Sequence, residues 1–326
     1  MIGAPQDSQS VFDQTIENKN RLFSNKRSDG TSGAERILDI QQKLFHKPKF
    51  TLDKTRPVFT IGSCFARNVE ASLERRNIDC ITSKAVYPAD YYAIEGGEDR
   101  NGALNAYTPA SMLATLRLPD RPDAMTAGVL DVGRGEYADM MLHGLRFLNP
   151  EELQECRAKL INTYRQLPDA GTVIVTLGFT ESWYYRDFDL YVNRAPFGSQ
   201  RLQRRASGFQ FHNLSSAQVV AILEGILAEV FSKCSSETKV IMTVSPVPLG
   251  RSFSAHDVII ANDYSKATLL SAAVEIESRY DRVAYFPSYQ YVTYRKREDA
   301  YQADGSHVKA EIVDEVIGSF VDKYFV

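Results

Sequence analysis

The sequence is poor in the residues that mark several classes of protein. It contains only four cysteines, which are far apart and include no C-x-x-C pair, and this argues against a zinc site and against a disulfide framework. It has five histidines, and no two of them have the spacing of metal ligands. We therefore expect neither a metal site nor another cofactor.

A basic excess and a long apolar run are missing as well. The net charge of −3 and the pI near 6.0 argue against a surface that follows nucleic-acid phosphates. No apolar run approaches the length of a transmembrane helix, and residues 1–8 lack the basic and apolar regions of a signal peptide. The sequence therefore predicts a cytoplasmic protein with neither a nucleic-acid nor a membrane partner.

What the chain does contain is enough apolar material for one large core, since 44% of its 326 residues are hydrophobic. Residues 1–33 are polar and predict a flexible or loosely docked arm, followed by one domain over residues 34–326. Within that domain, glycine and proline are scattered through residues 84–149, which we interpret as a large insertion. It includes an expected helix over 109–118 and an expected hairpin around 131–147.

Short apolar runs alternate with segments of helical periodicity. The runs at 58–61, 172–177, 239–244 and 282–286 are typical of buried parallel strands, and a shorter run at 78–81 predicts a further strand. Helices are expected at 37–45, 64–76, 151–166, from 215, at 262–280 and at 308–324. This alternation predicts a three-layer α/β/α sandwich around a parallel sheet.

The first strong strand ends in Gly62-Ser63-Cys64, and a helix begins almost at once. A polar nucleophile at such a junction lies above the carboxyl edge of the sheet, where the N–H groups of the first helical turn favour a developing oxyanion. The alternative is an ordinary turn in which small residues permit close packing.

Asp304 and His307 form a second candidate pair just before the last helix. Their i, i+3 spacing lets the carboxylate reach the imidazole, and Gly305 permits the tight turn between them. The carboxylate would orient an imidazole that acts as general base. The alternative is that Asp304 only caps the helix by accepting from backbone N–H groups.

The sequence resembles a known family. Residues 62–66 spell GSCFA, the motif after which the GSCFA domain family is named, and that family looks distantly similar to the GDSL/SGNH esterases. Segments at 176–183, 243–249, 261–266, 285–289 and 304–307 match in the same order. Together they cover about residues 58–325.

The resemblance implies an SGNH-hydrolase-like, flavodoxin-like fold with the nucleophile early in the chain and the Asp/His pair late. It implies hydrolysis of an acyl ester, or acyl transfer, on a small-molecule or glycan substrate that carries hydroxyl groups. An acyl thioester is the expected donor for transfer in the cytoplasm. The register of the motif places Cys64 at the nucleophile position, with Ser63 as the alternative. The rival interpretation is a binding or assembly module that keeps the fold without the chemistry.

The resemblance also directs attention to the loop after the central strand, where SGNH enzymes carry an oxyanion-binding Asn. This sequence has Thr180 and Glu181 after Gly178 instead, and the Thr180 hydroxyl is the expected substitute donor. Asn105 and Asn193 match polar positions of the family and are expected near the substrate. For Asn105 the alternative is that its segment only leads into a helix capped by Thr108. Trp183 either stacks on a sugar ring or, as we favour, packs in the core.

Overall fold

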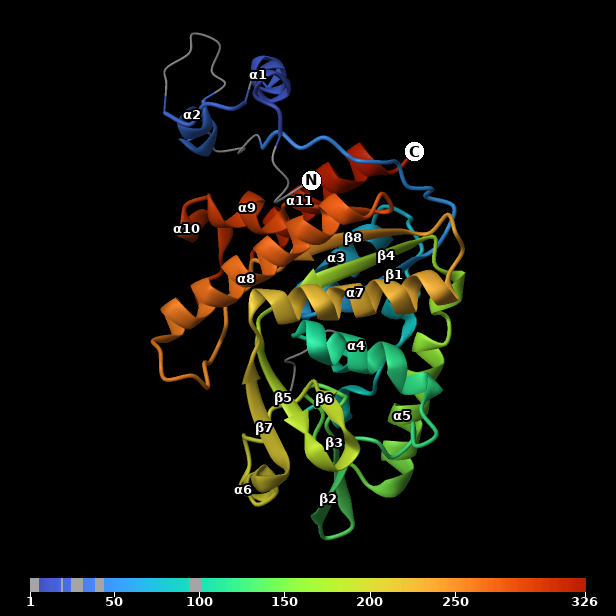
Figure 1. Cartoon of the computed structure of the whole chain (residues 1–326). Helices are drawn as coiled ribbons and strands as arrows, with labels where there is room; N and C mark the ends of the chain where they lie inside the picture. Colours follow the sequence, from blue (N-terminus) through green and yellow to red (C-terminus); the bar gives the residue numbers. More distant parts are fainter. Residues whose placement is uncertain (1–5, 19, 25–31, 39–43, 94–100) are drawn as a thin grey trace.

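The computed structural model describes residues 6–18, 20–24, 32–38, 44–93 and 101–326. At its centre lies a four-stranded parallel sheet in the order β1 (Val58–Gly62), β4 (Thr172–Leu177), β8 (Lys239–Val244) and β9 (Val283–Tyr285) (Figure 1). Except for one half-buried lysine at the start of β8, all residues of these strands are buried, as expected for short apolar runs covered on both sides. The predicted parallel sheet is confirmed.

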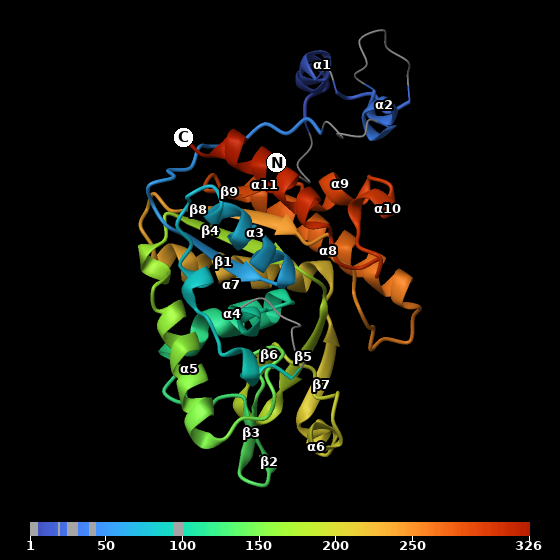
Figure 2. The same ribbon diagram turned by 180° about the vertical axis from the view of Figure 1, so that it is seen from behind.

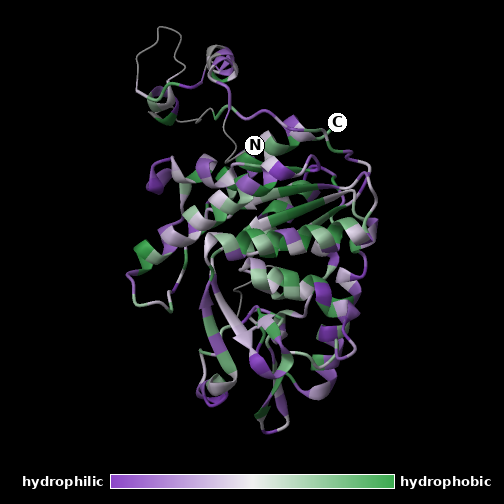
Figure 3. Cartoon of the chain, in the orientation of Figure 1, coloured by the Kyte–Doolittle hydropathy of each residue, from purple (hydrophilic) through white to green (hydrophobic). Residues whose placement is uncertain are grey.

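Alternating side chains of each strand enter two separate cores. Phe59 and Ile61 join Val173 and Val175 in one core, while Val58 and Ile174 belong to the other. The first core is covered by α4 (Pro109–Arg117), α5 (Pro150–Tyr164), α7 (Ser216–Lys233) and α8 (Val258–Arg279), and the second by α3 (Cys64–Glu74) and α11 (Ala310–Tyr324) (Figures 1 and 2). Figure 3 shows the central strands mostly in the green of hydrophobic residues, whereas most helices alternate green with purple along their length. The three-layer α/β/α prediction is confirmed.

The strand expected at 78–81 is reduced to one isolated bridge between Cys80 and Val58, on the outer side of β1. Val58 N–H donates to the Asp79 carbonyl at 2.8 Å, and Ile81 N–H donates to the Val58 carbonyl at 2.9 Å. The chain then enters the 3₁₀ turn Thr82–Lys84, which ends the pairing. If the bridge at Cys80 is counted as the second strand in the chain, the strand order is 2-1-3-4-5, which is that of a flavodoxin-like sheet.

This order creates a topological switch point between β1 and β4. The chain leaves β1 into α3 in one layer, and after β4 it reaches α7 in the opposite layer. In open α/β sheets, ligands bind where neighbouring connections diverge in this way, outside the carboxyl ends of the strands. The Ser63-Cys64 turn and the loop that begins at Gly178 both lie at this edge.

Two small antiparallel sheets extend the molecule beyond the central one. One pairs β2 (Val129–Gly133) with β3 (Glu136–Asp139), which is shorter than the predicted hairpin, and the other places β5 (Glu181–Tyr185) between β6 (Leu190–Val192) and β7 (Phe209–Asn213). The region 84–149 packs on the central domain, because α4 lies against α7 and its side chains enter the first core. Residues 94–100 of the expected insertion lie outside the described residues.

The remaining described elements are short. They are α1 (Ser8–Glu17), α2 (Gly33–Leu38), α6 (Gln200–Gln203), α9 (Ser288–Thr293) and α10 (Arg297–Ala300), with 3₁₀ turns at Ala89–Tyr91, Gly102–Leu104, Leu118–Asp120, Leu167–Asp169, Arg186–Phe188 and Ala206–Gly208. The helix expected over 37–45 is therefore observed only up to Leu38, and residues 39–43 lie outside the described ranges. No helix in the described ranges is long and apolar enough to cross a membrane.

The start of α8 differs from the sequence prediction by about one turn. The helix begins at Val258, because Asp257 caps it by accepting from the Ile259 N–H at 2.8 Å. Asn262, where the sequence predicted the helix to begin, accepts from the Leu249 N–H at 3.0 Å and so holds the preceding loop against the helix.

Candidate active site

The turn between β1 and α3 is held closely against β4. Gly62 pairs with Thr176, and a Cβ atom at Gly62 would lie 1.8 Å from Thr176 Oγ1. The Gly62 carbonyl accepts from the Ala106 N–H at 2.9 Å, which fixes the segment that contains Asn105 beside the turn. Glycine is therefore required here by close packing, as the alternative interpretation of this motif proposed, and this does not exclude chemistry at the next two residues.

Ser63 and Cys64 differ in accessibility. Ser63 is the residue before α3 and is 2% exposed. Its buried Oγ does not cap the helix and has no hydrogen-bond partner among the described residues. Cys64 is the first residue of α3 and is partly exposed. Of the two candidate nucleophiles, Cys64 is therefore the one that a substrate reaches more easily.

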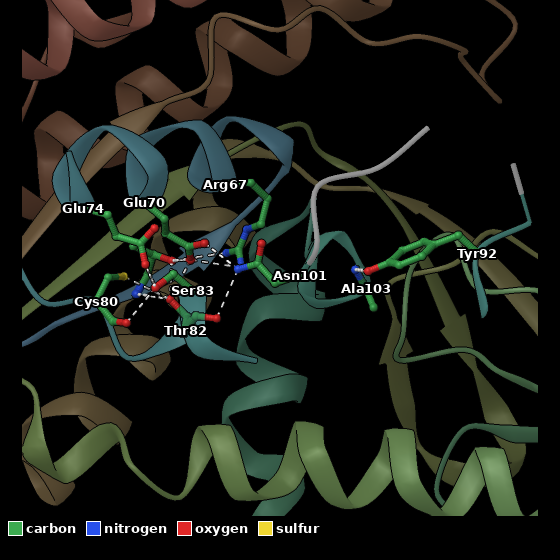
Figure 4. Close-up of polar contacts among 10 residues, drawn as sticks. Arg67, Glu70, Glu74, Cys80, Thr82, Ser83, Tyr92, Asn101 and Ala103 are labelled. Carbon is green, nitrogen blue, oxygen red and sulfur yellow. Dashed lines mark hydrogen bonds and ion pairs between the residues drawn. The ribbon is translucent and has the colours of Figure 1, made fainter. Parts of the chain in front are cut away.

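A buried polar network lies under the same turn and joins β1, α3 and the segment after residue 100 (Figure 4). The Glu70 carboxylate accepts from the hydroxyls of Thr60 and Thr82, the latter at 2.6 Å, and from Asn101 Nδ2 at 2.6 Å. Arg67 Nη1 lies 3.0 Å from Glu70, and both side chains are almost fully buried. Because three chain segments meet on one carboxylate, this network holds the backbone on both sides of the Gly62 turn in place.

Lys266 is a site residue that sequence reasoning missed. It is 2% exposed, and its ammonium donates to the carbonyls of Gly178 at 2.7 Å and Val247 at 2.8 Å. No carboxylate of a described residue lies within 4 Å of it. Burial lowers the pKa of Lys266 to about 7, and the charge of Cys64 acts in the opposite direction. A signal was present in the sequence, because Lys266 ends the matching segment 261–266, but its burial could not be read there.

The Asp304–His307 pair is formed as predicted. His307 Nδ1 and the Asp304 carboxylate are hydrogen-bonded, and Asp304 also accepts from the N–H groups of Ser306 and His307. These bonds, led by the one from the His307 ring, lower the pKa of Asp304 to about 2. Gly305 takes a left-handed conformation with φ of 66°, so the tight turn is confirmed.

This pair lies on an exposed loop, and the His307 side chain is 60% exposed. The loop is attached to the end of β8, because Tyr301, which forms a bridge with Val308, donates its hydroxyl to the Pro246 carbonyl at 3.0 Å. The pair is therefore at the carboxyl edge of the sheet. Among the described residues, the ring of His307 has a hydrogen bond only to Asp304.

In the loop after β4, the groups that were expected to bind an oxyanion already form hydrogen bonds within the protein. The N–H groups of Gly178 and Phe179 both donate to the Tyr107 carbonyl at 3.1 Å. The Thr180 hydroxyl is fully buried, donates to Asn213 at 2.6 Å and lies 2.9 Å from the Ser265 hydroxyl. An oxyanion role for Thr180 stays a prediction, and it would require one of these bonds to be exchanged.

The structure places Asn105 beside the Gly62 turn, which the sequence did not indicate. It is fully buried next to Ala106, its Nδ2 donates to the Tyr107 hydroxyl at 3.4 Å, and its Oδ1 has no partner among the described residues. The predicted cap is present as well, since Thr108 accepts from the Ser111 N–H at 3.2 Å at the start of α4. Both interpretations of this segment are therefore compatible with the structure.

A cleft of about 770 Å³ opens beside this edge. Its wall includes the predicted residues Glu181 and Asn193, and its aromatic lining consists of Tyr107, Phe147, Phe179, Trp183, Phe197 and Phe253. Ser63, Cys64, Asp304 and His307 are not among the residues that line it. The cleft and the Gly62 turn are joined by the short segment from Asn105 to Tyr107.

His143 lines the cleft and was also missed. Its Nε2 lies 3.0 Å from the Tyr107 hydroxyl, and Tyr107 stacks on Phe179 with ring centroids 5.2 Å apart. Burial, with a smaller effect of the nearby Arg194, lowers the pKa of His143 to about 4. The ring is therefore neutral at physiological pH. Its sequence neighbours carry no pattern that would have singled it out.

Comparison with protein families gives a match to the GSCFA family over residues 57–320. The chain belongs to the GSCFA family. The match includes the Ser63-Cys64 turn, Lys266 and the Asp304–His307 pair of this GSCFA chain. A comparison with curated proteins finds no match. In the described part of the chain, no group of three or more His, Cys, Asp or Glu residues is arranged to hold a metal ion.

Proposed function

We propose that this protein is an acyl-ester hydrolase or acyltransferase whose nucleophile is Cys64, with Ser63 as the alternative, and whose general base is His307. The observation that carries the proposal is the Asp304–His307 hydrogen bond on a loop at the same sheet edge as the start of α3. A carboxylate that orients an imidazole is the arrangement that activates a nucleophile for acyl transfer, and a helix N-terminus is a favourable place for such a nucleophile.

In the proposed reaction, the nucleophile attacks the carbonyl carbon of an ester or thioester and transfers its proton to His307. N–H groups of the first turn of α3 and the Asn105 amide are the nearest candidates for stabilising the oxyanion. The tetrahedral intermediate collapses, and the leaving alcohol or thiol takes the proton from His307. Water or a substrate hydroxyl then attacks the acyl-enzyme, with His307 again as base, and releases an acid or a new ester.

Two features of the site support Cys64 over Ser63. Cys64 is partly exposed whereas Ser63 Oγ is buried, and the ammonium of Lys266 lies close enough to Cys64 for their charges to interact. A helix N-terminus and a nearby cation both stabilise a thiolate. The Ser63 hydroxyl is buried, so a substrate reaches it less easily.

The rival proposal, a binding or assembly module on this fold, is favoured by the loop after β4. Both N–H groups at its start are bonded to Tyr107, and the Thr180 hydroxyl is bonded inside the protein. An oxyanion site built as in SGNH enzymes would therefore be incomplete. Reaction with iodoacetamide and with a fluorophosphonate separates the two proposals, because an inactive site should react no faster than the unfolded chain.

Intact-mass measurement after mixing with 4-nitrophenyl acetate tests the acyl-enzyme directly. We expect an acetyl adduct on the wild-type protein and on Ser63→Ala, and no adduct on Cys64→Ala or His307→Ala. His307→Ala should keep the wild-type melting temperature, because the side chain is exposed and outside both cores. An adduct that survives Cys64→Ala but is lost in Ser63→Ala would make Ser63 the nucleophile. A His307→Ala variant that keeps the full kcat would show that His307 is not the general base.

A further inference from the structure

The arginines that line the cleft carry more positive charge than the described carboxylates around them neutralise. It is lined by three arginines, of which Arg146 is paired with Glu152 at 3.0 Å. Arg194 and Arg251 have no carboxylate partner among the described residues. Glu181 is the one carboxylate in the described lining.

The charge of Glu181 is already compensated by groups other than arginine. One oxygen accepts from the Ser252 hydroxyl at 2.6 Å, and the other accepts from the Phe253 N–H at 2.7 Å. These bonds attach the loop that carries Phe253 to the start of β5. Glu181 is therefore a positioning residue for the aromatic wall, and it forms no ion pair with Arg194. Asp139, whose charge acts on Arg194 from beyond ion-pair distance, is itself paired with Arg157 at 2.6 Å.

Arg194 is held with most of its donors unused. Its Nη1 donates to the Leu145 carbonyl at 2.8 Å, and its guanidinium lies 5.7 Å from the centre of the Phe147 ring. A guanidinium has five N–H donors in a planar fork that fits a carboxylate or phosphate. Burial lowers the pKa of Arg194, which indicates that water solvates this cation poorly and that an anion would stabilise it.

Aromatic rings line the same cleft. Phe253 and Phe197 stack with centroids 5.3 Å apart, and both contact Trp183 edge-on at 5.1 and 5.3 Å. Asn193, which precedes Arg194, is 9% exposed, and its Oδ1 has no donor among the described residues while its Nδ2 is held by Met141 at 2.8 Å. The wall thus offers ring faces, one amide acceptor and one guanidinium that has no carboxylate partner among the described residues.

We propose that this cleft binds an anionic ligand with a ring, the anionic group at Arg194 and the ring against the Trp183, Phe197 and Phe253 wall. A carboxylate or a phosphate provides the shared anionic chemistry, and the Asn193 amide oxygen accepts from a ligand hydroxyl. The inference rests on the proposed function only in taking the cleft as the place where the acyl donor or acceptor docks. The binding itself requires no turnover.

The test uses matched anionic and neutral probes on Cys64→Ala, which cannot form the proposed acyl-enzyme. Methyl β-D-glucuronide is compared with methyl β-D-glucoside, and phenyl phosphate with phenol, by titration calorimetry. Trp183 is the only tryptophan of the chain, so its fluorescence reports binding at the cleft itself. We expect at least one anionic probe to bind about tenfold or more tightly than its neutral counterpart, as for a hydrogen-bonded charge pair.

The variants locate the anion. Arg194→Gln should remove the advantage of the anionic probe and leave the neutral probe unchanged, whereas Arg204→Gln, which replaces an exposed arginine outside the cleft lining, should not. If Arg194→Gln does not fold, the salt dependence of the anionic probe on the parent protein tests whether its advantage is electrostatic, and an advantage that does not fall with rising salt would overturn the inference. A response to the glucuronide alone identifies a sugar carboxylate, and a response to phenyl phosphate alone identifies a phosphate.

Equal affinity for charged and neutral probes, or an unchanged advantage in Arg194→Gln, would overturn the inference. Either result leaves the acyl chemistry at Cys64 untouched, because that chemistry is measured by adduct formation in the protein with its cysteine intact. Conversely, loss of the adduct would reject the proposed function without changing these binding measurements.

Discussion

The ammonium of Lys266 lies 2.7 Å from the carbonyl oxygen of Gly178, so a buried lysine of α8 holds the loop that leaves the central strand. Its second acceptor, the Val247 carbonyl at 2.8 Å, belongs to the loop after β8. One side chain thus joins two loops at the carboxyl edge of the sheet and places a cation near Cys64. A buried ammonium without a carboxylate is unfavourable in itself, which points to a role at the site.

We expect Lys266→Met to slow the alkylation of Cys64 by iodoacetamide at pH 7 by about tenfold, because the variant loses the cation that stabilises the thiolate. Peptide mass spectrometry measures the modified fraction at Cys64 over time. Cys80 and Cys156 should react slowly in both proteins, since burial raises the pKa of each thiol to about 12.

The control for this measurement is Lys54→Met, which removes an exposed lysine that precedes β1, at the opposite end of that strand from Cys64. It should alkylate at the wild-type rate. An unchanged rate in Lys266→Met, in a variant with the wild-type circular dichroism spectrum, would mean that the lysine acts only as a structural clamp.

The Glu70 network predicts a large loss of stability from a small change. Glu70→Gln leaves the buried Arg67 without its counter-ion, and breaking a buried pair in this way destabilises a protein by about 3–5 kcal/mol. The free energy of unfolding from urea titration measures the effect. Asp79→Asn is the matched control, because its pair with Lys84 is more than half exposed and contributes less than about 1 kcal/mol. Similar losses in the two variants would contradict the network's role.

The neutral state of His143 predicts a pH dependence of stability. Its pKa is about 4 in the folded protein against 6.5 for an ordinary histidine, so the unfolded chain binds more protons between these values. Stability is therefore full above pH 6.5 and falls as the pH falls toward 4. Between pH 7 and 5 this one residue accounts for about 2 kcal/mol.

Urea titrations at pH 7 and pH 5 test this expectation. His143→Gln should lose less stability than the wild type over the interval, while His256→Gln, which replaces an exposed histidine, should follow the wild type. His46, whose pKa burial also lowers to about 4, contributes equally in all three proteins. Identical pH dependence in His143→Gln and the wild type would show that another group is responsible.

Much of the fold was determined by the sequence alone, because apolar runs and their period are local properties. The continuous runs at 58–61 and 172–177 require burial on both faces, and helical periodicity between the strands requires layers on both sides of the sheet. The turn at Gly62 and the i, i+3 pair of Asp304 and His307 are local as well, so residue spacing was enough to predict them.

Only the tertiary structure decided what depends on contacts between distant segments. The strand predicted at 78–81 is only one bridge, because the chain turns at Thr82, whose hydroxyl donates to Glu70 of α3, and this contact cannot be read from either segment alone. Lys266 looks like a surface residue of a helix until two carbonyls from loops 88 and 19 residues away in the chain enclose it. That no carboxylate of the described residues pairs with Arg194 is likewise visible only in three dimensions, because it depends on all the groups that pack around the charge.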